Sequence, residues 1–103
     1  MQINETQYQS LIRQNTPVLV AFEAPWCGYC RKIEPAYERI AKSWVGKLTV
    51  ATVNIDDHPG LVHSQEIEVV PTLILYRNGQ ELDSIVAPES KAAIESFIAE
   101  NLG

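Results

Sequence analysis

The chain contains two cysteines, Cys27 and Cys30, within the stretch "APWCGYC", and their thiols are its clearest candidates for chemistry. Two thiols separated by two residues can form a redox centre, half of a metal site, or a structural disulfide. A structural bridge across so short a loop removes little chain entropy, roughly 2 kcal/mol in the loop model. A metal site needs four ligands, and the other soft donors, His58 and His63, are poorly spaced for one helical face. The pattern therefore favours redox chemistry, with the other two as alternatives.

The position of the two cysteines predicts which thiol attacks the substrate and which resolves the mixed disulfide. They follow the continuous apolar run "VLVAF" (18–22), which is typical of a strand buried on both faces. Behind them, apolar residues at spacings of three and four predict an amphipathic helix. A helix start offers unpaired N–H groups and about half a positive charge, both of which stabilise a thiolate. We therefore expect Cys27 to be the attacking nucleophile and Cys30, one turn later, to be the more buried, resolving thiol.

The remaining elements predict the architecture that holds these thiols. Two further core strands are indicated by "LTVATVNI" (48–55) and "TLILY" (72–76), and Asn78-Gly79 is a strong hairpin signal leading into "ELDSIV". A capping pair, Asn4 and Gln7, predicts a first helix, a short helix is expected over 61–67, and the last helix over about 89–102. Strands alternating with helices predict parallel pairing, to which the hairpin adds an antiparallel edge. The expected fold class is α/β, one domain over 1–103 with a central mixed sheet flanked by helices on both faces.

Composition excludes several classes of function. The chain has 103 residues and a formal charge of −5, from 13 acidic against 8 basic residues, and the basic residues are scattered. Nucleic-acid binding needs clustered Lys and Arg, so no nucleic-acid partner is expected. No signal peptide is visible, and no apolar stretch approaches the roughly 20 residues of a membrane helix. We expect a cytoplasmic monomer with no membrane partner, in a compartment where close cysteine pairs are more often catalytic or metal-binding than structural.

Taken together, these motifs resemble the thioredoxin family. The shared features, in the family's order and over nearly the whole chain, are "APWCGYC" after an apolar strand, a proline five residues after the second cysteine, "VNIDDHPG", "VVPTLILYRNGQ" and an amphipathic final helix. The resemblance implies a thioredoxin fold and a protein-disulfide reductase that cycles between dithiol and disulfide. It implies no cofactor and no metal. The implied partners are proteins with disulfides and an upstream electron donor, a thioredoxin reductase.

The resemblance also implies which residues meet the substrate. It places Val70 and Pro71 beside the cysteines, with a cis peptide bond between them. The turn exposes the backbone of Val70 to an extended substrate strand and denies metal ions access to the thiols. Trp26 forms an apolar wall of the site, and Gly28 permits close approach of a substrate backbone. Ala87 stands where the family has a glycine on the substrate-facing surface.

Tyr29 is the first departure from the family, which usually has proline between the cysteines after the glycine. Loss of the proline frees a backbone N–H that can bond to the Cys27 thiolate, and such stabilisation of the reduced form raises the reduction potential. We therefore expect a couple more oxidising than the roughly −270 mV of a standard thioredoxin. Two alternatives stay open: a disulfide isomerase or oxidant, and a thioredoxin-fold module that binds metal or a partner with little turnover.

The second departure concerns proton transfer. The family's buried acid and its lysine partner are replaced by Ala21 and Thr52, so no charge of that pair is left buried alone. Strand side chains alternate, which puts Glu23 on the same face as Ala21. Our hypothesis is that Glu23 takes over the missing acid's role and carries protons to and from Cys30 through water. The alternative is a solvated glutamate at the end of a strand.

Overall fold

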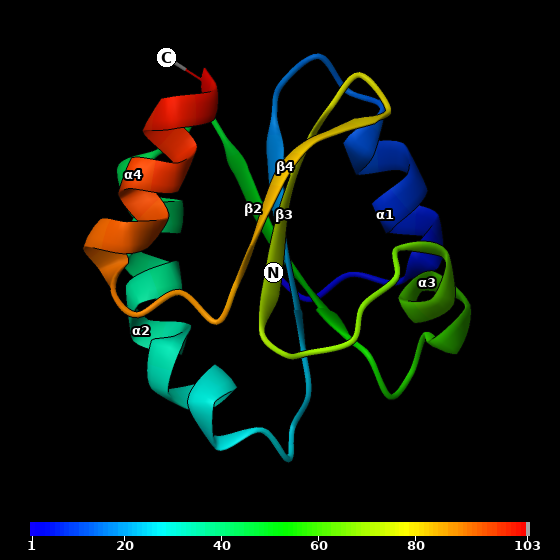
Figure 1. Cartoon of the computed structure of the whole chain (residues 1–103). Helices are drawn as coiled ribbons and strands as arrows, with labels where there is room; N and C mark the ends of the chain where they lie inside the picture. The colour runs from blue at the N-terminus through cyan, green and yellow to red at the C-terminus, as the bar shows by residue number, and fades with distance from the viewer. Residues whose placement is uncertain (103) are drawn as a thin grey trace.

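A mixed four-stranded sheet forms the centre of the molecule, with helices on both faces (Figure 1). The computed structural model describes residues 1–102 of the chain. The predicted order of elements is confirmed, as is a central mixed sheet with helices on both faces. The elements are α1 (Glu5–Ile12), β1 (Val18–Glu23), α2 (Gly28–Ser43), β2 (Thr49–Asn54), α3 (Pro59–Ser64), β3 (Thr72–Arg77), β4 (Gln80–Val86) and α4 (Lys91–Leu102).

The strands lie in the order β2-β1-β3-β4, and only β1 and β2 are parallel. β3 runs antiparallel to β1, which the alternation of strands and helices did not predict. The reason lies in the length of α3. Its six residues span about 9 Å, whereas a six-residue strand spans about 20 Å, so α3 is too short to return the chain across the sheet. β3 therefore starts at the end of the sheet where β1 and β2 finish.

The sheet separates two layers of core, as the alternation along β1 requires. Leu19 and Ala21 face α2 and α4, and Val18, Val20 and Phe22 face α1 and α3. Figure 1 shows these two helix pairs on opposite sides of the sheet. Glu23, two residues beyond Ala21, continues the row that faces α2.

Local signals set the ends of the elements. Asn4 and Gln7 form the predicted capping box, with both backbone-to-side-chain hydrogen bonds at 2.8 Å. The hairpin residues Asn78 and Gly79 both have positive φ, as their turn requires. The last helix begins at Lys91 rather than near residue 89, because the Ser90 hydroxyl accepts the Ala93 N–H and caps it.

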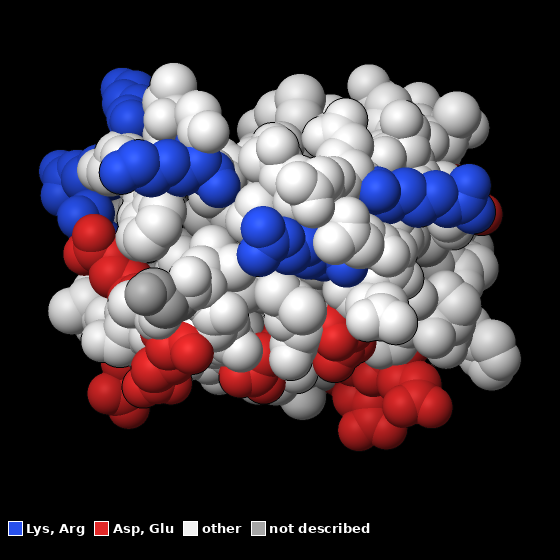
Figure 2. All heavy atoms as spheres, turned by 90° about the horizontal axis from the view of Figure 1, so that it is seen from above, with Lys and Arg blue, Asp and Glu red and all other residues white. Residues whose placement is uncertain are grey.

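The two ends of the sheet differ in what they present. The end of the sheet where β1 and β2 finish and β3 begins is at the bottom of Figure 1. Cys27 and Cys30 follow β1 directly in the chain and so lie at this end. Figure 2 shows the opposite end, where Lys and Arg side chains are spaced by uncharged residues and Asp and Glu gather along one edge. Within residues 1–102, no helix has the length and apolar character needed to cross a membrane.

Candidate active site

Cys27 is the N-cap residue of α2, and its sulfur does the capping. The Cys27 Sγ accepts the backbone N–H of Cys30 at 3.1 Å. This is the N3 position that an N-cap side chain usually reaches. The expected donor was the N–H freed at Tyr29, so that expectation is corrected: Cys30 supplies the hydrogen bond. Cys30 is the more buried thiol, at 3% exposed against 8% for Cys27.

The loop before β3 closes over the nucleophile candidate. The Val70–Pro71 peptide bond is cis, the geometry that the resemblance implied. Cys27 Sγ lies 3.8 Å from the Val70 carbonyl oxygen, and Val70 packs on the small cluster of Ala24, Cys27 and Cys30. The sequence-predicted neighbours Cys27, Cys30, Val70 and Pro71 are thus brought together.

Two other predicted residues lie at the surface beside the thiols. Trp26 is 65% exposed, and its Nε1–H donates to Asp56 Oδ1 at 3.2 Å. A Cβ added at Gly28 meets no atom within 4 Å, so this side of the loop is open to an approaching chain. Asp56 was missed by the sequence reasoning. Its signal was available, since it follows the strand parallel to the one that Trp26 follows, and such strands end at one edge.

Tyr29 bridges to the loop between β4 and α4. Its hydroxyl donates to the Pro88 carbonyl oxygen at 2.7 Å, and its side chain is half-buried. Ala87, the residue before Pro88, has φ of 44°, in the left-handed region that favours glycine. Ala87 N–H in turn donates to the Pro71 carbonyl oxygen at 2.8 Å. These hydrogen bonds tie the start of α2 and the start of β3 to the same loop, a connection for which the sequence held no signal.

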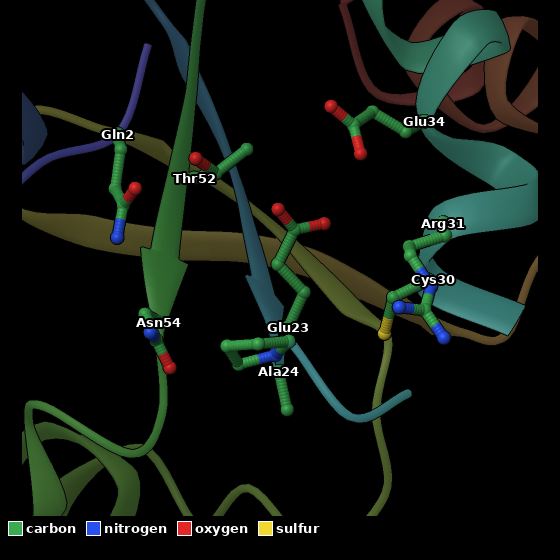
Figure 3. Close-up of a pocket in the computed structure, with 9 residues that line it drawn as sticks. Gln2, Glu23, Ala24, Cys30, Arg31, Glu34, Thr52 and Asn54 are labelled. Carbon is green, nitrogen blue, oxygen red and sulfur yellow. The ribbon is translucent and has the colours of Figure 1, made fainter. Parts of the chain in front are cut away.

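A cavity of about 320 Å³ lies behind Cys30, between the edge of the sheet and α2. Its charged and polar lining comes from β1, β2, α2 and the N-terminal segment: Gln2, Glu23, Arg31, Glu34, Thr52 and Asn54. In Figure 3 the carboxylates of Glu23 and Glu34 both point into this space, and the Cys30 sulfur lies at its margin. Glu34 was missed by the sequence reasoning, although it lies four residues after Cys30 and so on the same side of the helix.

Burial shifts the proton affinity of both groups at this cavity. Partial burial, and then the negative charge of Glu34, raise the pKa of Glu23 from 4.5 to about 7. Burial, followed by the hydrogen bond with Cys27, raises the pKa of Cys30 from 9.0 to about 12. A carboxyl with a pKa near neutral therefore shares a cavity with a thiol whose raised pKa means that it needs a base in order to ionise near neutral pH.

Ala21 and Thr52, which stand where the resemblance implies a buried acid and its lysine partner, are both uncharged. Ala21 and Thr52 are direct partners across the parallel strands β1 and β2. The hydroxyl of Tyr37, from the middle of α2, lies 2.7 Å from the Leu19 carbonyl oxygen and 2.8 Å from that of Ala51. Helical spacing carries no information about a hydroxyl partner, so this contact of Tyr37 could not be predicted from the sequence.

Comparison with known proteins agrees with this geometry. The thioredoxin family model matches residues 1–100. Thioredoxin 1 of Nostoc sp. is 34% identical over 99 residues, covering 96% of this chain and 92% of its own. A solved structure of Plasmodium falciparum thioredoxin superposes with a TM-score of 0.87 at 30% identity, covering 96% of both chains.

Some relatives are considerably longer than this chain. The M-type chloroplastic thioredoxin of Zea mays is 38% identical over 88 residues, which cover 85% of this chain but 53% of the maize protein. The chain thus spans about half the length of that relative and nearly all of the Nostoc protein. The family match and these identities, over a structure with the same fold, lead to one conclusion. The chain belongs to the thioredoxin family.

Proposed function

We propose that this chain is a thiol–disulfide oxidoreductase that reduces disulfides in other proteins. The observation that carries the proposal is the Cys27 sulfur at the N-cap of α2, held by the Cys30 N–H and facing the Val70 carbonyl. Thioredoxin homologues support the same activity and do not favour the isomerase or binding-module alternatives. The reaction needs two thiols and no cofactor.

The proposed cycle assigns a separate step to each thiol. The Cys27 thiolate attacks one sulfur of a substrate disulfide, which forms a mixed disulfide and releases the other substrate sulfur as a thiolate. Cys30 then loses its proton and attacks Cys27 Sγ, so the substrate leaves as a dithiol and the protein holds a Cys27–Cys30 disulfide. The order follows from the difference in access: Cys27 is 8% exposed and precedes the open position at Gly28, whereas Cys30 is 3% exposed.

The substrate is proposed to lie across the open side of the thiols. Exposed Trp26 gives an apolar contact, Gly28 leaves room for a backbone, and the cis turn presents Val70 as a partner for an extended chain. Tyr29, in the first turn of α2, and Ala87, in the loop after β4, border the same surface and are linked by the Tyr29–Pro88 hydrogen bond. This arrangement suits an unfolded or flexible segment around a disulfide better than a small molecule.

Glu23 is proposed to serve the second step. Cys30 must give up a proton before it attacks, and its raised pKa makes this unfavourable without a base. Glu23 borders the same cavity with a pKa of about 7, which suits a group that accepts and returns protons near neutral pH. The transfer runs through water in the cavity. The same route in reverse protonates Cys30 when the disulfide is reduced.

The oxidised protein needs an electron donor, and we propose a thioredoxin reductase. All groups of the cycle come from one chain, so we propose a monomer. We place the protein in the cytoplasm, where reduced thiols are maintained. The names of several relatives place those proteins in chloroplasts.

The test is reduction of insulin with dithiothreitol as the electron source. The wild-type chain is expected to accelerate precipitation of the reduced insulin chains, and Cys27→Ser to abolish the acceleration. Catalysis by Cys27→Ser at the wild-type rate would remove the proposed nucleophile. Equilibration with glutathione then separates reductase from isomerase, since a potential near −270 mV indicates a reductase and one near −180 mV an isomerase.

A further inference from the structure

Glu23 and Glu34 border two neighbouring cavities rather than one. The cavity behind Cys30, of about 320 Å³, and a second of about 250 Å³ further along α2 share Gln2, Glu23, Glu34 and Thr52 in their linings. Both are open to solvent along the side of the molecule between the sheet edge and α2. The two carboxylates thus stand between the buried thiol and bulk water.

The three groups come from elements whose relative position is fixed by the core. Cys30 and Glu34 lie one turn apart on α2, and Glu23 approaches from the end of β1. α2 is anchored there by Ile33 and Tyr37, which are buried against the sheet. Glu34 is exposed, Glu23 is half-buried and Cys30 is buried, so burial increases along the series from solvent to thiol.

We propose that Glu34 is a positioning residue for the resolving step, a carboxylate at the cavity mouth that sets how strongly Glu23 holds its proton. This inference rests on the proposed function, in which Glu23 exchanges a proton with Cys30. A negative charge beside Glu23 disfavours its ionised form, and so makes its carboxylate a stronger base when the Cys30 proton is transferred. In each forward turn one proton moves from the Cys30 thiol to the Glu23 carboxylate and then to water. Cys30 uses the freed electron pair to displace the substrate sulfur.

Other charged or titratable groups face this region. Arg31 lines the first cavity, and Glu38 and the Tyr37 hydroxyl-bearing ring line the second. The N-terminal amine lowers the pKa of Glu23, in opposition to Glu34. Burial is the largest cause that raises the pKa of Glu23, and the charge of Glu34 is the next. Glu34 lies one turn of α2 before Glu38. Glu38 therefore provides a matched control: the same residue type, on the same helix, with the same change of charge.

The experiment compares Glu34→Gln with Glu38→Gln in the full chain. The first readout is the Glu23 carboxyl carbon in an NMR pH titration of the reduced protein, which requires no catalysis. We expect Glu34→Gln to lower the titration midpoint by on the order of 0.5 pH unit, as for loss of one neighbouring charge in a partly solvated site. Glu38→Gln is expected to leave the midpoint within a fraction of that shift. Equal midpoints in wild type and Glu34→Gln, or equal shifts in both variants, overturn the proposal.

The second readout is the rate of mixed-disulfide resolution between pH 5 and 9, measured in a single turnover with a fluorescent peptide disulfide. Glu34→Gln is expected to move the pH midpoint of this rate downward by the same amount as in the NMR titration. If the Glu23→Gln variant resolves the mixed disulfide at the wild-type rate, the proton role of Glu23 is refuted. If the wild-type protein does not resolve the mixed disulfide at all, the proposed function itself is refuted. If the wild type resolves the mixed disulfide and Glu34→Gln has the same pH midpoint of the rate as wild type, this inference alone is refuted.

Discussion

Replacement of Glu23 by glutamine should make the protein more stable at alkaline pH and leave it nearly unchanged at acid pH. The folded chain raises the pKa of Glu23 to about 7, mainly through burial, so folding favours the protonated carboxyl. Between about pH 4.5 and 7 the folded state binds more protons than the unfolded state, and stability falls as pH rises through this window. Below this window the carboxyl is protonated in both the folded and the unfolded state. Above it the carboxyl is ionised in both, and the folded state bears the full cost of a partly buried carboxylate. Glutamine is neutral throughout and escapes the penalty.

The magnitude follows from the difference in pKa. An increase from 4.5 to about 7, at 1.36 kcal/mol per pKa unit, corresponds to about 3 kcal/mol for a fully buried group. Glu23 is only half-buried, and solvent in the adjoining cavity screens its charge, so the expected effect is about 1–2 kcal/mol. The free energy of unfolding of Glu23→Gln, relative to that of the wild type, should therefore be about 1–2 kcal/mol higher at pH 8.5 than at pH 4.

Urea unfolding followed by tryptophan fluorescence, at several values between pH 4 and 8.5, measures this difference. The reduced protein is used throughout, so that a disulfide does not contribute. Glu38→Gln, an exposed change of the same kind, is the control and should show the wild-type pH dependence. A constant difference between wild type and Glu23→Gln across the whole range would show that Glu23 is fully solvated and refute the reasoning.

Three further substitutions test single contacts by urea unfolding. Tyr29→Phe removes the hydroxyl bonded to Pro88 and should cost about 0.5–1.5 kcal/mol; no loss would mean that the bond is replaced by water. Ala87→Gly relieves a positive φ and should stabilise by about 0.5–1 kcal/mol after the entropy cost of glycine, so a destabilised variant would contradict the assigned backbone. Tyr37→Phe deprives two strand carbonyls of a partner and should cost about 1–2 kcal/mol, whereas a neutral effect would assign Tyr37 to packing alone.

The sequence predicted the elements and their order because these depend on periodicity and short turn signals. Asn4 with Gln7, and Asn78 with Gly79, act over a few residues and appear in the structure as expected. The direction of β3 was not predicted, since it depends on whether α3 is long enough to cross the sheet. Helical spacing predicts that an element such as α3 is a helix, but it does not determine at which end of the sheet the next strand begins.

The site shows the same division between local and distant information. Cys27 at a helix start could be inferred from the chain alone, and the location of Glu23 beside the cavity followed from strand alternation. The partner of Tyr29 could not, because Pro88 is 59 residues away in the sequence. The donor to Cys27 was assigned to the wrong residue, since the choice between two adjacent N–H groups depends on the geometry of the first helical turn.

The most direct test of the central claim is to trap the mixed disulfide. Cys30→Ser retains the proposed nucleophile and lacks the resolving thiol, so incubation with a peptide disulfide should leave one peptide half attached to Cys27. Mass spectrometry of the intact and digested protein locates this adduct, and dithiothreitol should release it. We predict one adduct per chain, on Cys27. Under the same conditions Cys27→Ser should form an adduct far more slowly, on the buried Cys30. No adduct on Cys30→Ser, or faster modification of Cys30 than of Cys27, would contradict it.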